Sequence, residues 1–166
     1  LAGASAVSSV DIDGDGDLDI IAADEGGDAI HWLENNGAAN PSFTVNFLGS
    51  GVDGPFGLSI IDLDQDGDMD VVVASHGDNK VRWFSNNGNA DPSFSGYQIA
   101  AQIDARGVHA ADVDNDGDID VAVAGASSGT THILLNDGSQ SFGNQNLIDS
   151  SANPRSVFII DLDNDG

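Results

Sequence analysis

One acidic motif recurs along this chain at a nearly constant interval and constrains the fold more than any other feature. The stretch DIDGDGDLD begins at Asp11, DLDQDGDMD at Asp62 and DVDNDGDID at Asp112, while DLDNDG begins at Asp161. The intervals between the first aspartates are 51, 50 and 49 residues. Such a period predicts an array of similar units that stack on one another, because one unit alone cannot bury its apolar face.

Each unit contains four short apolar runs that are bounded by Gly, Asn, Asp or Pro. In the first unit these runs are SAVSSVDI, LDIIAA, AIHWLE and FTVNFL, and none of them has a sustained helical period. Four short antiparallel strands in about 50 residues are typical of a β-propeller blade. We therefore predict an all-β chain of four-stranded antiparallel blades, in which the second strand of each blade is buried.

The repeat boundaries predict about three blades and the first strand of a fourth. The three complete repeats cover residues 4–53, 54–104 and 105–153, and residues 154–166 begin a truncated fourth repeat. Closed propellers need about four to eight blades. We therefore expect the segment to belong to a larger propeller or to complete itself by assembly.

The spacing of the aspartates within the motif predicts a metal site. Positions 1, 3, 5 and 9 are aspartates in all three complete copies, and position 6 is always glycine. Two carboxylates about 4 Å apart repel by about 1 kcal/mol even in water, so such a loop needs a cation. Oxygen ligands favour calcium or magnesium, and a flexible set of six to eight oxygens favours calcium. The motif thus predicts one calcium ion (Ca2+) per repeat in the loop between the first two strands.

In each loop, we expect the carboxylates at positions 1, 3 and 5 to surround the ion, position 7 to offer its carbonyl and position 9 to close the site. The candidate residues are Asp11, Asp13, Asp15, Asp17, Asp19, Asp62, Asp64, Asp66, Asp68, Asp70, Asp112, Asp114, Asp116, Asp118, Asp120, Asp161, Asp163 and Asp165. The glycine at position 6 permits the positive φ of a tight turn. An EF-hand is excluded because it needs Glu at position 12 and flanking helices, whereas position 12 here is Ala22, Val73 or Val123.

The motif and its surroundings resemble the FG-GAP/VCBS repeats, which form the blades of integrin-α-like propellers. The resemblance rests on DxDxDGxxD in a unit of about 50 residues, preceded by GPFGLSIIDLD and followed by MDVVVAS. It implies calcium in the loop of each blade and a seven-bladed propeller as the commonest context. It implies no single activity, because such repeats occur in adhesins, lectins, polysaccharide-degrading enzymes and other surface proteins.

The charge of the chain narrows the function classes. There are 28 Asp and Glu against 4 Lys and Arg, for a net charge of −24, which argues against nucleic acid or an anionic membrane as a partner. The chain has no Cys, and no apolar run is long enough to span a membrane. We expect a non-enzymatic extracellular or cell-surface scaffold for adhesion or ligand binding, with structural calcium and a glycan or protein ligand on a propeller face. The alternatives are a subunit of an extracellular fibre or surface layer, and a propeller of a polysaccharide-active enzyme.

Two further patterns have competing interpretations. The sequence GASSG at residues 125–129 fits a hydrolase nucleophile elbow, but that elbow needs a strand-to-helix turn, and a hairpin turn is expected here. His31, Arg82 and His132 occupy equivalent positions. They either form a polar ring at one propeller face or lie at ordinary outward-facing strand positions, and the second interpretation is favoured.

The tryptophans and two of the arginines also occupy equivalent positions. Trp32 and Trp83 either stack on sugar rings or pack between blades, and Ile133 at the third equivalent position favours packing. Arg106 and Arg155 each lie six residues before a motif. For these arginines, pairing with neighbouring acids and ligand binding both stay open.

Overall fold

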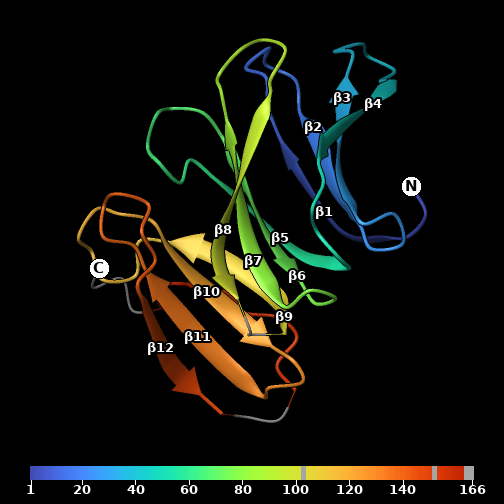
Figure 1. The fold of residues 1–166 in the computed structure, drawn as a ribbon. Helices are drawn as coiled ribbons and strands as arrows, with labels where there is room; N and C mark the ends of the chain where they lie inside the picture. Colours follow the sequence, from blue (N-terminus) through green and yellow to red (C-terminus); the bar gives the residue numbers. More distant parts are fainter. Residues whose placement is uncertain (102–103, 151–152, 163–166) are drawn as a thin grey trace.

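The computed structural model describes residues 1–101, 104–150 and 153–162. It contains three separate antiparallel sheets, each with four strands in chain order (Figure 1). Sheet 1 contains β1 (Ala4–Val10), β2 (Asp19–Asp24), β3 (Ala29–Asn35) and β4 (Phe43–Gly49). Sheet 2 contains β5 (Pro55–Ile61), β6 (Asp70–Ser75), β7 (Lys80–Asn86) and β8 (Phe94–Ala101). Sheet 3 contains β9 (Ala105–Ala111), β10 (Asp120–Gly125), β11 (Thr130–Leu135) and β12 (Asn144–Asp149). The prediction of all-β, four-stranded propeller blades is confirmed, and no helix in the described part of the chain is long and apolar enough to cross a membrane.

The three sheets stack through their first strands, so that β5 lies between β1 and β9. Residues 153–162, which include the start of the fourth repeat at residue 154, lie beside β9 in turn. The Ile159 N–H donates to His109 Nδ1 at 3.4 Å, and the centroids of the Phe158 and His109 rings are 4.3 Å apart. We call β1, β5, β9 and residues 153–162 the inner edge. The three sheets follow one another in the blue, green and orange parts of Figure 1 and do not close a ring.

The core consists of two apolar layers, one between each pair of neighbouring sheets. Ile21, Ile30 and Trp32 of sheet 1 pack with Val71 and Val73 of sheet 2. The second layer joins sheets 2 and 3, and its members include Val72, Val81, Trp83, Val121, Val123 and Leu134. Strands β6 and β10 are buried along their whole length, as predicted for the second strand of a blade. The tryptophans are also buried, which confirms that they pack between blades.

The first strand of each sheet carries a one-residue β-bulge at the same place. The bulged residues are Ser5, Phe56 and Arg106, which have no partner in the register with the second strand. A glycine follows the bulge in β5 and β9. A Cβ atom on Gly57 would collide with the carbonyl oxygen of Arg106, and one on Gly107 would lie 2.7 Å from the Cα of Ser156. The neighbouring segments of the inner edge therefore approach closely only because these two residues lack a side chain.

Candidate metal centres

Each acidic loop connects the first and second strands of its sheet. The residue before the motif pairs with the aspartate at position 9, and these pairs are Val10 with Asp19, Ile61 with Asp70 and Ala111 with Asp120. The glycine at position 6 has a φ of +95°, +102° and +97° in Gly16, Gly67 and Gly117. The predicted hairpin location of the loops and the predicted positive φ are both confirmed.

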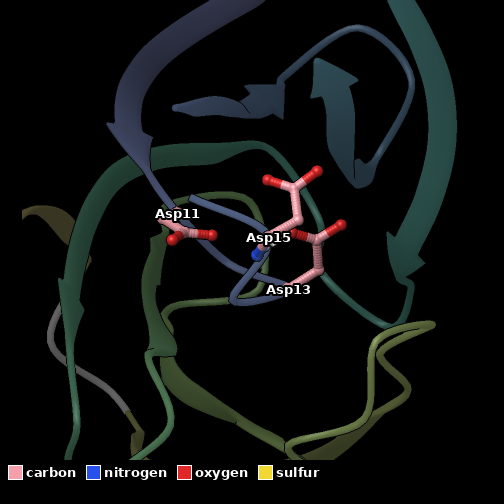
Figure 2. Close-up of side chains that lie close together, drawn as sticks. All are labelled: Asp11, Asp13 and Asp15. Carbon is pink, nitrogen blue, oxygen red and sulfur yellow. Dashed lines mark hydrogen bonds between the residues drawn. The ribbon is translucent and has the colours of Figure 1, made fainter. Parts of the chain in front are cut away.

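Three carboxylates meet in every complete loop. In the first loop, Asp11, Asp13 and Asp15 each offer an oxygen atom, and these oxygens lie within 4.8 Å of one another (Figure 2). The same spacing holds for Asp62, Asp64 and Asp66 in the second loop and for Asp112, Asp114 and Asp120 in the third. The structure thus gathers positions 1, 3 and 5 in two loops and positions 1, 3 and 9 in the other. Asp116, Asp19 and Asp70 lie outside these groups.

Main-chain hydrogen bonds hold the carboxylate at position 1 in the same way in each loop. The N–H of the position-6 glycine donates to Oδ2 of Asp11, Asp62 and Asp112, at 3.0, 2.9 and 3.0 Å. The carboxylate at position 5 accepts from the N–H of position 7, as in Asp66 and Asp68, at 3.0 Å. Such short-range bonds orient the acids before any ligand binds.

The aspartate at position 9 ties the loop to the end of the third strand. Asp70 is fully buried and accepts hydrogen bonds from the Asn86 N–H at 2.8 Å and the Leu63 N–H at 3.0 Å. Asp120 is also fully buried, and it accepts equivalent bonds from Asn136 at 2.9 Å and Val113 at 3.0 Å. Position 9 therefore has a structural role that the motif alone did not indicate.

The asparagine at the end of β3 and β7, and directly after β11, is a site residue that sequence reasoning missed. The side-chain amide of Asn35, Asn86 and Asn136 donates to the carbonyl of position 8 in its own loop, at 3.0, 3.2 and 3.2 Å. Asn86 also donates to the Ile12 carbonyl in the loop of sheet 1, at 3.0 Å. The sequence signal that could have identified this asparagine is its recurrence 24 residues after the first aspartate of each motif.

The aspartates at position 7 lie outside the three carboxylate groups and pack on a second turn instead. A Cβ atom on Gly37 or Gly88 would collide with the carboxylate of Asp17 or Asp68. On Gly138 it would lie 2.7 Å from Asp118 Oδ2. These glycines follow the recurrent asparagine, so the close approach explains why a residue without a side chain stands there.

We expect Gly88→Ala to destabilise sheet 2 more than Gly67→Ala. Both residues have positive φ, +66° and +102°, and an alanine is strained in either position by about 1 to 3 kcal/mol. Only at position 88 does the new Cβ also meet a carboxylate, whereas nothing lies within 4 Å at position 67. Urea unfolding measures the two losses, with Gly143→Ala as the control because Gly143 has open space and no positive φ. A larger loss for Gly67→Ala would contradict the packing argument.

The electrostatics of the loops favour a bound cation. Burial, followed by repulsion from neighbouring carboxylates, raises the pKa of Asp13, Asp64 and Asp114, which all stand at position 3. Burial also raises the pKa of Asp70 to about 6, although hydrogen bonds from Asn86 and Leu63 oppose that shift. A cation among these groups would favour their ionised forms.

The donor set fits a hard divalent cation. Asp19 Oδ2, Asp64 Oδ1 and Asp112 Oδ1 are buried oxygens without a hydrogen-bond partner, one in each complete loop. A buried, unpartnered carboxylate oxygen is costly, and coordination to a cation would satisfy it. In the fourth loop Asp161 is exposed, while Asp163 and Asp165 lie outside the described residues.

The other candidate residues make contacts within their own sheets. His31 Nε2 lies 3.7 Å from the Asp24 carboxylate, His132 Nε2 lies 3.0 Å from Thr130 Oγ1, and Arg82 forms an ion pair with Asp78. Residues 126–129 form the turn between β10 and β11, so the GASSG sequence lies at a hairpin turn, as predicted, and β11 rather than a helix follows it.

Comparison with known proteins agrees with the repeat geometry. The family model described as the FG-GAP-like repeat matches residues 11–73, 62–123 and 112–166, each match running from one acidic loop to the next. A search of curated proteins found no significant match. Together the matches cover nearly the whole chain, and the protein belongs to the FG-GAP-like repeat family.

Proposed function

We propose that this chain is a calcium-binding β-propeller repeat module of an extracellular or cell-surface protein, acting as a scaffold for adhesion or ligand binding. The observation that carries the proposal is the buried carboxylate oxygen without a hydrogen-bond partner in each of the three complete loops. Asp64 and Asp112 belong to the carboxylate groups of their loops, and the charge of Asp19 acts on Asp13 in the first loop. The chain as a whole has a net charge of −24. A cation at each loop supplies the missing partner and offsets the repulsion.

The residues that would hold calcium are the gathered carboxylates of each loop. In the third loop, the Gly117 N–H holds Oδ2 of the position-1 aspartate, Asp112, and leaves the buried Oδ1 without a hydrogen-bond partner and available to the ion. When bound, calcium supplies positive charge and accepts several oxygen ligands at once. The buried position-9 aspartate holds the loop to the third strand, so an ordered loop also orders the blade.

An extracellular location and a non-catalytic role are part of the proposal. Calcium sites in extracellular modules commonly have a Kd of about 10⁻⁴ to 10⁻³ M, and roughly millimolar external calcium occupies such sites to between about half and nine-tenths. The chain has no Cys for disulfides, so calcium is its means of cross-linking neighbouring strands. The dense acidic clusters are accounted for by the loops, which leaves no carboxylate pair assigned to catalysis.

We expect replacement of Asp64 and Asp66 by Ala to reduce the number of bound calcium ions by one and to weaken sheet 2. Both residues belong to the carboxylate group of the second loop, while the other two loops keep theirs. Isothermal titration calorimetry counts the ions bound by the variant and by the parent chain. The control is Asp91→Ala, which removes an exposed aspartate outside the motifs. An unchanged ion count in the double variant would refute the assignment of this loop.

A further inference from the structure

A small pocket lies on the inner edge, away from the acidic loops. Its volume is about 260 Å³, and its lining includes Ala6 of β1, Phe56 and Leu58 of β5, Arg106 of β9, and Arg155 and Ser156 beyond them. Arg106 lies six residues before Asp112 along an extended strand. At about 3.3 Å per residue, this places the pocket roughly 20 Å from the loop. We call it the inner-edge pocket.

The charge of the inner-edge pocket is opposite to that of the chain. Two of the four Lys and Arg residues line it, and none of the 28 acidic residues does. The other two cations, Lys80 and Arg82, both pair with Asp78. Among the described residues, no carboxylate lies within ion-pair distance of Arg106 or Arg155. The pocket therefore concentrates the positive charge that the fold leaves unpaired.

The backbone of the inner edge directs these side chains to the pocket. Arg106 and Phe56 are the bulged residues of β9 and β5, and a bulge takes a side chain out of the regular alternation of the strand. The Arg106 guanidinium lies over the Phe56 ring, 5.2 Å from its centroid. This cation–π contact orients the guanidinium and leaves its charge available. Arg155 occupies the equivalent position beside β9, six residues before Asp161, and is exposed.

Asp104, whose pKa is lowered in part by the charge of Arg106, already has a hydrogen-bond partner in Ser127. Burial opposes ionisation of Asp104, but hydrogen bonds from Ser127, and then the positive charge of Arg106, hold its pKa below the ordinary value. The Asp104 carboxylate accepts the Ser127 N–H. Asp104 also does not line the pocket. An anion in the pocket therefore does not displace an existing partner of Arg106.

We propose that the inner-edge pocket binds a small organic carboxylate, no larger than a monosaccharide. Guanidinium groups match a planar carboxylate through two parallel hydrogen bonds, which a spherical charge does not offer. The volume of about 260 Å³ is at the low end for ligand pockets and limits the size of the ligand. The carboxylate belongs to a sugar acid or to an acidic amino-acid derivative. The proposal does not depend on the calcium sites.

Calorimetric titration of the calcium-loaded chain with D-galacturonate and with N-acetylaspartate tests the proposal. We expect saturable binding of at least one of these probes, and their relative affinities identify the source of the carboxylate. The neutral sugar D-galactose should not bind. The R106Q/R155Q variant should bind the active probe about tenfold more weakly or worse, because charge-assisted hydrogen bonds are lost. The K80Q variant removes one cation outside the pocket and should bind like the parent chain.

Three further variants keep the result interpretable. R155Q alone changes an exposed side chain and should weaken binding without loss of stability. R106K/R155K keeps both charges but loses the planar forks, and should also bind more weakly. D91N removes an exposed charge outside both the pocket and the calcium loops and should not affect probe binding. Titration of the probe into calcium without the protein measures chelation of calcium by the probe. Absence of binding to both carboxylates, equal binding by R106Q/R155Q, or full binding by R106K/R155K would each overturn the proposal.

Discussion

Removal of calcium by a chelator is expected to lower the Tm of this chain by roughly 15 to 30 °C, and calcium added back should restore it. Calcium supplied at 100 times its Kd, about 10 to 100 mM for sites of this class, stabilises the folded state by about 2.7 kcal/mol per site, so three filled loops contribute roughly 8 kcal/mol. In a chain of 166 residues, each kcal/mol shifts the Tm by about 2 to 4 °C. Without calcium, the carboxylates of each loop also repel one another across less than 5 Å.

Circular dichroism melts in chelator, in calcium and in magnesium measure this effect. Sodium chloride at matched ionic strength is the essential control, because salt alone screens repulsion between exposed charges. Magnesium should restore less stability than calcium, since it demands a smaller, near-octahedral set of ligands. If the Tm is the same in chelator as in calcium, the loops do not hold a structural ion.

The second large effect is expected for Asp70→Ala, which should lower the free energy of unfolding by about 2 to 6 kcal/mol. Asp70 is fully buried and accepts the N–H groups of Asn86 and Leu63. Removal of its carboxylate leaves two buried donors without a partner, at about 1 to 3 kcal/mol each. The loss should persist in chelator, because these hydrogen bonds are made without an ion.

Urea unfolding in the presence and absence of calcium separates the hydrogen-bonding role of Asp70 from its predicted role in the calcium site. Asp91→Ala is the matched control, since that aspartate is exposed and lies outside every motif. It should change stability by no more than about 0.5 kcal/mol. If Asp70→Ala in chelator behaves like Asp91→Ala, the two hydrogen bonds do not stabilise the blade.

The features that the sequence predicted correctly are those set by short-range patterns. Apolar runs of strand length, bounded by turn residues, predicted the four-stranded sheets, and glycine at position 6 predicted the positive φ of Gly16, Gly67 and Gly117. The packing of Trp32 and Trp83 between blades followed from Ile133 at the third equivalent position. In each case the neighbouring residues and the comparison between repeats are enough to predict the structural feature.

The features that the sequence did not predict depend on contacts between distant segments. The hydrogen bonds from Asn86 and Leu63 to Asp70 need the third strand beside the loop, and the pairing of Asp68 with Gly88 needs the same packing. The third loop gathers position 9 in place of position 5 although its motif has the same acids. The side-chain orientations that distinguish these loops are not encoded by spacing alone.

Because each first strand begins with a bulge, the side chain at the bulge can vary without a change in the strand order of the blade. The residue there has no ladder partner, and its identity differs among Ser5, Phe56 and Arg106 while the sheets keep the same strand order. One side chain per blade can therefore be exchanged with little effect on the apolar layers. A propeller built this way carries a row of independently adjustable groups, and its selectivity can be altered one blade at a time.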